Sequence, residues 1–228
     1  MDDHPSPRIS RKATRHWPLV SGIVAVVLAV SLGALIFLRH NGPFLFDEAW
    51  MGEILEHRAG WLDVPALVLN FLGGGWFARI LVPVGTILAL VLVRRRWATL
   101  YYALAVLPSM LAVQLLKAIF DRPRPEEILV ASDVGSFPSG HVANAATIAV
   151  SLAIIFARAW VWYVGAMYTV LMALSRTYLG AHWLTDTIGG ALLGAGVAVI
   201  LWAPFARRLI PERKPRSATA SAGGPLPS

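Results

Sequence analysis

The sequence contains no cysteine, so neither a disulfide framework nor a thiolate metal site can form. Charged residues are also scarce, at 14% of the 228 residues, whereas hydrophobic residues make up 57%. The mean hydropathy of +0.62 lies outside the range of soluble globular domains. The composition therefore indicates an integral membrane protein, whose stability must come from helices packed within the lipid.

Six apolar segments come close to the roughly 20 residues that a membrane-spanning helix needs. We therefore predict an all-α fold, a bundle of six transmembrane helices. A cleaved signal peptide is the alternative for the first segment, but its apolar stretch is longer than a signal core and no small-residue cleavage pattern follows it. The expected spans are about 18–38, 77–93, 98–116, 141–157, 159–174 and 184–205.

The basic residues orient this bundle. With the N-terminus in the cytoplasm, thirteen of the twenty Lys and Arg fall on the cytoplasmic side, against three of the thirteen carboxylates. This matches the positive-inside rule, and an even number of spans returns the C-terminus to the cytoplasm. Residues 1–16 and 211–228 are expected to be disordered cytoplasmic tails around a membrane domain of residues 17–210. The tails are too short for nucleic-acid arms, so no nucleic-acid partner is expected.

The first outer loop carries a short amphipathic pattern. Phe46 and Trp50 recur at helical spacing within residues 44–58, on the face opposite Asp47. This pattern fits a helix lying in the membrane interface, and an ordinary packed helix fits it equally well. The glycine run at residues 73–75 is expected to break a helix.

Three clusters of charged and small residues lie at the ends of the apolar segments, all on the outer side of the predicted bundle. Placing a charged side chain at the centre of a membrane helix costs roughly 2.5 to 3.5 kcal/mol of insertion free energy. A charged residue that is kept there despite this cost usually has a function. Each residue alone has an ordinary structural explanation, such as a snorkelling lysine or a serine at a helix start. Together they predict one site. The clusters are Lys117 with Arg124-Pro125, Pro138-Ser139-Gly140-His141, and Ser175-Arg176 with His182 and Asp186.

The residue types suit the binding of phosphate. Ser139 at the N-cap, followed by Gly140, leaves backbone N–H groups without a helical partner at a helix start, where an anion is bound favourably. Lys117 supplies a point charge, while Arg124 and Arg176 supply planar forks that match phosphate oxygens. These five residues are the predicted phosphate-binding group.

The two histidines suit phosphoryl transfer. His182 and Asp186, four residues apart, share a helix face, so the carboxylate can fix the imidazole tautomer. This predicts His182 as the nucleophile. His141 has no carboxylate near it in sequence and is the better general acid for the leaving oxygen, then the base for water. Asp186 is the only acid in the motifs, and metal pairs need clustered carboxylates, so no metal or other cofactor is expected.

This ordered set of motifs resembles the type 2 phosphatidic acid phosphatase superfamily, also called the acid phosphatase-haloperoxidase family, over roughly residues 45–205. The resemblance implies metal-independent hydrolysis through a phosphohistidine on His182, with protonation by His141. It also implies six helices with the site at the outer face of the plasma membrane. It assigns no role to Arg122.

The membrane branch of this family acts on phosphatidate, phosphatidylglycerol phosphate, diacylglycerol pyrophosphate, and polyprenyl phosphates or diphosphates. An outward site in a small chain favours a polyprenyl diphosphate substrate by analogy, with a phospholipid phosphate next. Two alternatives stay open: a lipid phosphotransferase, and a non-enzymatic anion transporter that uses the same charges. The sequence does not indicate an oligomeric state.

Overall fold

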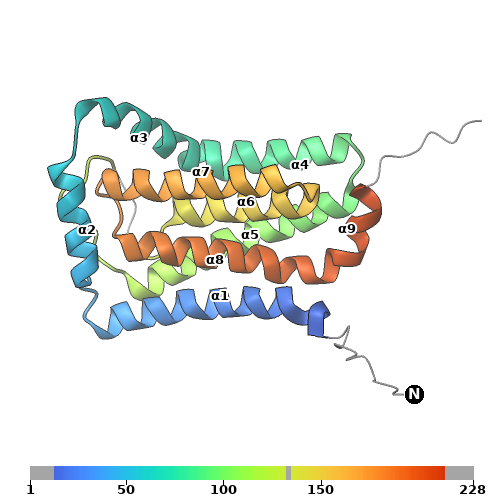
Figure 1. The fold of residues 1–228 in the computed structure, drawn as a ribbon, viewed down its shortest axis with the longest axis horizontal. Helices are drawn as coiled ribbons and strands as arrows, with labels where there is room; N and C mark the ends of the chain where they lie inside the picture. The colour runs from blue at the N-terminus through green and yellow to red at the C-terminus, as the bar shows by residue number, and fades with distance from the viewer. Residues whose placement is uncertain (1–12, 132–134, 214–228) are drawn as a thin grey trace, which may run out of the picture.

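The computed structural model describes residues 13–131 and 135–213, and all regular structure in these ranges is helical. The long helices of the described residues lie side by side (Figure 1). They are α1 (Ala13–Leu38), α5 (Arg96–Phe120), α6 (Gly140–Phe156), α7 (Ala159–Tyr178) and α8 (Leu184–Trp202). The shorter elements are α2 (Leu45–Glu56), α3 (Gly60–Gly73), a π-helix (Phe77–Leu81), α4 (Val82–Leu92), a 3₁₀ turn (Ala203–Phe205) and α9 (Ala206–Arg213).

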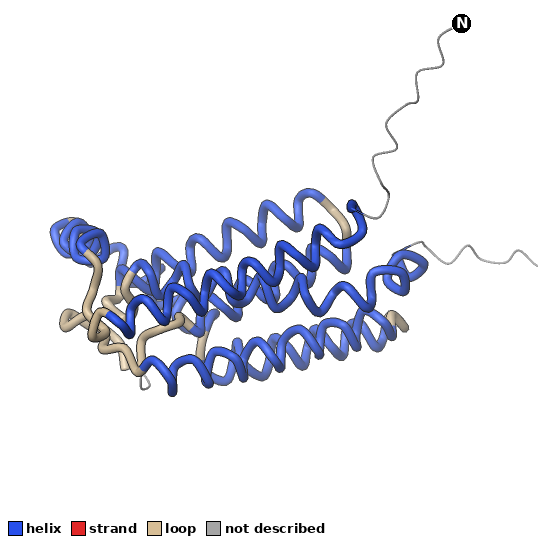
Figure 2. Tube along the Cα trace, turned by 90° about the horizontal axis from the view of Figure 1, so that it is seen from below, coloured by secondary structure: helices blue, strands red, loops and turns tan. Residues whose placement is uncertain are grey.

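Helix extends into both segments that were expected to be disordered tails. α1 begins at Ala13 and α9 ends at Arg213. The rest of those two segments, residues 1–12 and 214–228, lies outside the described residues. Figure 2 shows that the longest loops gather at the end of the bundle beside α2.

The helices confirm that this is a membrane protein. Three of those described are long and apolar enough to cross a membrane: His16–Leu38, Arg96–Phe120 and Leu184–Glu212. α3 and residues 77–92 pass the same test only together, as a pair bent by 42° that forms either a broken span or a re-entrant loop. Large apolar side chains such as Leu111, which is 70% exposed, cover the outer faces, as lipid contact requires. The count of six spans and the side on which the termini lie stay predictions.

The region before α4 differs from the sequence-based expectation, because α3 occupies residues 60–73, where no helix was predicted. At 14 residues, with Pro65 inside it, α3 is too short to be recognised as a span by itself. The glycine run does interrupt the helix, as predicted. Gly74 ends α3 and Gly75 has a φ of +57°, a left-handed conformation that glycine adopts without strain.

α8 lies at the centre of the bundle and packs closely on α1 and α6. A Cβ atom at Gly194 would overlap the carbonyl oxygen of Ala143 on α6. A Cβ at Gly196 would come within 2.9 Å of the carbonyl oxygen of Gly22 on α1. Small residues let membrane helices approach this closely, which gives them van der Waals contact that lipid cannot replace. The close packing also brings the first turn of α6 next to the first turn of α8.

α2 crosses one end of the bundle and packs on α7 and α8 (Figure 1). The expected division of its faces is wrong at Asp47, which is fully buried although it was placed opposite the apolar face. Phe46, from the expected apolar face, is half exposed. The physical reason is that Asp47 meets the buried guanidinium of Arg122 and the hydroxyl of Thr185, which together offset the cost of burying a carboxylate.

Candidate active site

A cavity of about 460 Å³ lies at the α2 end of the bundle, where α5 and α7 end and α6 and α8 begin. Aromatic side chains of α3 and the π-helix, Phe71 and Phe77, form part of its wall. Six of the eight predicted site residues line it. They are Lys117, Arg124, Gly140, His141, Arg176 and His182. The structure therefore brings most of the predicted site together, and the roles of these residues stay predictions.

Carbonyl oxygens of the backbone and of an amide side chain hold the three predicted cations of this cavity. Lys117 Nζ donates a hydrogen bond to the Gly135 carbonyl oxygen at 2.6 Å, and Arg124 Nη2 donates to the same oxygen at 2.8 Å. The guanidinium of Arg176 donates to the side-chain oxygen of Asn70 on α3. Arg79 of the π-helix also lines the cavity, so four positive charges meet there, three of them guanidinium groups whose planar forks match phosphate oxygens.

His182 is 2% exposed and lies just before α8, which begins at Leu184. The expectation that His182 and Asp186 share a helix face is therefore wrong in detail, because only Asp186 is within the helix. The spacing still brings the side chains together: His182 Nδ1 lies 3.6 Å from Asp186 Oδ2. On the other side of the ring, Nε2 lies 3.4 Å from Arg124 Nη1. Nδ1 thus faces the carboxylate and Nε2 faces the cations.

Burial and the neighbouring cations set the charge of this imidazole. Desolvation, followed by Arg176, Arg124 and Lys117, lowers the pKa of His182 well below its ordinary value of 6.5. A lowered pKa means that the ring is neutral at neutral pH, so one ring nitrogen keeps a free lone pair. A neutral imidazole is the form that a nucleophile needs.

His141 lies in the first turn of α6 and lines the same cavity. The break between α3 and the π-helix packs directly against it, since a Cβ atom at Gly74 would overlap the His141 ring. Glycine at position 74 is therefore a steric requirement of the present position of His141.

Ser139 occupies the N-cap position of α6, as predicted, but its side chain does not cap the helix. Its Oγ is buried and makes no hydrogen bond with any residue in the described ranges. Its backbone N–H donates to the carbonyl oxygen of Asp186 at 2.9 Å. Ser139 and Asp186 thus stand behind the cavity instead of lining it.

Arg122, for which the sequence suggested no function, connects two buried carboxylates. Its Nη1 donates to Asp186 Oδ1 at 2.6 Å and to Thr185 Oγ1 at 2.7 Å. Its Nη2 donates to Asp47 Oδ2 at 2.9 Å. The side chains of all three charged residues are completely buried. We call Asp47, Arg122 and Asp186 the buried ion triad.

The buried ion triad fixes the orientation of Asp186. With Oδ1 bound to Arg122, the other oxygen, Oδ2, accepts the backbone N–H of Trp183 at 2.9 Å and faces His182. The triad therefore links α2 to the candidate nucleophile. The sequence signal that could have drawn attention to Arg122 is its place two residues before the matched Arg124, because a buried arginine needs a carboxylate partner.

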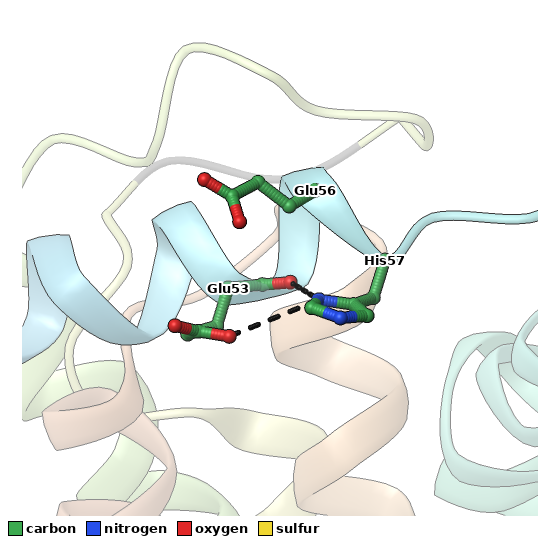
Figure 3. Close-up of side chains that lie close together, drawn as sticks. All are labelled: Glu53, Glu56 and His57. Atoms are coloured by element: carbon green, nitrogen blue, oxygen red, sulfur yellow. Dashed lines mark hydrogen bonds and ion pairs between the residues drawn. The ribbon is translucent and has the colours of Figure 1, made fainter.

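Within the ranges the structure describes, one group of three residues could hold a metal ion. Glu53, Glu56 and His57 lie together at the end of α2 (Figure 3). All three side chains are exposed, none lines the cavity, and His57 Nδ1 lies 2.9 Å from the carbonyl oxygen of Glu53. This group therefore contributes nothing to the candidate site.

The structure is thus a bundle of apolar helices in which cations and two histidines line one cavity. Residues 98–209 match the PAP2 superfamily. The chain is also 31% identical to phosphatidylglycerophosphatase B of Bacillus subtilis over 160 residues, which cover 65% of this chain and 77% of that protein. The chain belongs to the PAP2 superfamily, which confirms the family resemblance of its motifs.

Two further comparisons agree with this assignment. The chain is 30% identical to decaprenylphosphoryl-5-phosphoribose phosphatase of Mycobacterium tuberculosis, over 79% of this chain and 89% of that one. The crystal structure of a transmembrane PAP2-type phosphatidylglycerolphosphate phosphatase from Bacillus subtilis superposes with a TM-score of 0.68 at 25% identity. That superposition covers 86% of this chain and 99% of the other. The relatives are thus phosphatases of the PAP2 family, which supports a phosphate hydrolase.

Proposed function

We propose that this protein hydrolyses a lipid phosphate or diphosphate through a phosphohistidine intermediate on His182, without a metal ion. The observation that carries the proposal is the meeting of the three predicted cations and two histidines at one cavity. The names of the relatives support lipid phosphates as the substrate class.

In the first step, Lys117, Arg124 and Arg176 hold the oxygens of the phosphoryl group. Such cations stabilise the negative charge that spreads over these oxygens in the transition state. His182 Nε2 attacks phosphorus, and the bond from phosphorus to the leaving lipid oxygen breaks. His141 gives a proton to that oxygen. The positive charge that grows on His182 is stabilised by Asp186 next to Nδ1.

In the second step, water replaces the departed lipid. His141, now neutral, takes a proton from this water, whose oxygen attacks phosphorus. The bond between phosphorus and Nε2 breaks, and inorganic phosphate leaves. His182 returns to its neutral state and His141 is again protonated, so the cycle closes without a cofactor.

We further propose that the cavity opens on the extracytoplasmic side of the plasma membrane, with six spans and both termini in the cytoplasm. The support is the distribution of charge: Arg94 and Arg95 lie in the turn between α4 and α5 and Arg96 begins α5, at the opposite end of the bundle from the cavity. Reporter tags at Ala131 and at the C-terminus test this arrangement. The Ala131 tag should read outside and the C-terminal tag inside, and a cytoplasmic signal at Ala131 would contradict it.

The experiment for the activity is phosphate release by the purified protein from a panel of lipid phosphates and diphosphates. The panel should contain phosphatidylglycerol phosphate, phosphatidate and a polyprenyl diphosphate. Released inorganic phosphate that disappears in His182→Ala is the expected result. Transfer of the label to an acceptor lipid without free phosphate would show a phosphotransferase, and anion flux that survives His182→Ala would show a transporter.

A further inference from the structure

A second hollow, of about 910 Å³, lies between the α4–α5 turn and α9. These two elements are at the opposite end of the bundle from α2 and the candidate active site (Figure 1). The proposed reaction uses none of the residues around it. Five arginines line it together with Trp97. These are Arg94 and Arg95 from the turn, Arg96 from the start of α5, and Arg207 and Arg208 from α9. We call this feature the arginine hollow.

The positive charge of the arginine hollow has little counter-charge. None of its five arginines forms an ion pair with a carboxylate within residues 13–131 and 135–213. The one carboxylate in the lining, Glu212, accepts the backbone N–H groups of Trp97 and Ala98 at 3.0 and 3.1 Å. It is therefore occupied at the start of α5. Cations gathered in a concave surface create a strong positive potential that attracts an anion.

Several of these guanidinium groups are also held in place. The Arg208 guanidinium lies 4.0 Å from the centre of the Trp97 ring, a close cation–π contact. Arg95 is half-buried, donates to the carbonyl oxygen of Ile155 at 3.2 Å and lies 5.7 Å from the Phe156 ring. A guanidinium fixed in this way loses less rotamer entropy when it binds, and its planar fork matches phosphate oxygens.

The positive-inside rule accounts for basic residues at this end of the bundle but not for their gathering around one hollow. Arg158, in the turn between α6 and α7, lies at the same end and is exposed, and it does not line the hollow. It has the same charge in the same half of the molecule. It therefore provides a matched control for any effect of overall charge.

We propose that the arginine hollow binds the phosphate group of an anionic phospholipid headgroup. The membrane supplies such headgroups at the level of the helix ends, where clustered arginines attract them. The bound lipid is not the substrate. A phosphodiester such as phosphatidylglycerol has the negative charge that the hollow would attract. It lacks the terminal phosphate that the catalytic cavity is proposed to remove. This inference therefore does not depend on the proposed reaction.

The test is lipid retention by the full-length protein, measured by native mass spectrometry from detergent with added phosphatidylglycerol or phosphatidylcholine. The unchanged protein should retain phosphatidylglycerol in preference to phosphatidylcholine. Arg208→Gln should weaken that retention about tenfold, since it removes a charge-assisted bidentate contact. Arg158→Gln should leave retention unchanged. Equal retention of the two lipids, or equal loss in the two variants, would overturn the proposal.

Two further measurements keep the result clear. In phosphatidylcholine, Arg208→Gln should have the same thermal unfolding midpoint and the same phosphatase activity as the unchanged protein. If Arg208→Gln does not fold, Arg94→Gln is used in its place. Millimolar inorganic phosphate should fail to displace phosphatidylglycerol. Binding of inorganic phosphate at the hollow without retention of phosphatidylglycerol would assign the hollow to a soluble anion and overturn the lipid proposal.

Discussion

The substitution Arg122→Gln tests the buried ion triad. It removes the guanidinium that bonds both Asp47 and Asp186, whose side chains are completely buried. Removing one partner of a buried ion pair costs about 3 to 5 kcal/mol, because the remaining charge stays buried without compensation. Here two carboxylates lose the same partner, so the expected loss lies at the upper end of that range.

Activity should fall together with stability. Asp186 would lose the hydrogen bond that fixes Oδ1, and with it the orientation of Oδ2 towards His182. We expect the substitution to change kcat more than KM, because no member of the triad lines the cavity where substrate would bind. Thermal unfolding in detergent and steady-state phosphate release measure the two effects.

Two matched variants make this result specific. Arg39→Gln changes an exposed arginine that stacks on Phe44, and should alter stability by about 0.5 kcal/mol or less. The double variant Asp47→Asn/Arg122→Gln should be less destabilised than the sum of its single changes, because it removes one of the unpaired charges. An Arg122→Gln protein as stable and active as Arg39→Gln would refute the role given to the triad.

Three further results are expected. Gly74→Ala places a Cβ atom that overlaps the His141 ring, and a misplaced catalytic group can reduce the rate more than about tenfold. We therefore expect kcat/KM, measured by phosphate release, to fall at least about tenfold. Gly60→Ala, whose new Cβ lies in open space, should leave kcat/KM unchanged. The acid limb of the kcat/KM profile against pH should lie below 6.5, because the pKa of His182 is lowered, and Arg176→Gln should move it to higher pH because a lost cation lets that pKa rise. Activity should survive strong chelation and be inhibited by vanadate, whereas activity that a divalent ion must restore would contradict the metal-free reaction.

The position of the site could be predicted from the sequence because the chain alternates direction. When helices run antiparallel, the end of one meets the start of the next, so motifs such as Lys117, His141 and His182 meet at one end. The types of these residues, cations and histidines, then indicated phosphate binding and phosphoryl transfer. Charge placement and helix length are properties of single segments, and a sequence displays such properties directly.

Other features depend on contacts between distant segments. Asp47 is buried because Arg122, 75 residues away, reaches it, and no local pattern of α2 indicates that contact. α3 was not predicted because it is too short to be recognised as a span by itself. Its pairing with residues 77–92 is visible only in the structure. The side chain of Ser139 does not make the predicted cap, although the helix begins where the residue predicted it.

The central claim is that His182 carries the phosphoryl group, and labelling of the phosphoenzyme with an alkaline quench tests it most directly. His141→Ala removes the residue that activates water, a contribution typically worth about 10²- to 10⁴-fold, so it should accumulate phosphoenzyme from a radiolabelled aryl phosphate with a good leaving group. The label should be acid-labile and base-stable, as a phosphohistidine is, and it should be absent from His182→Ala. Equal labelling of His141→Ala and His182→Ala would contradict the assignment of His182 as the nucleophile.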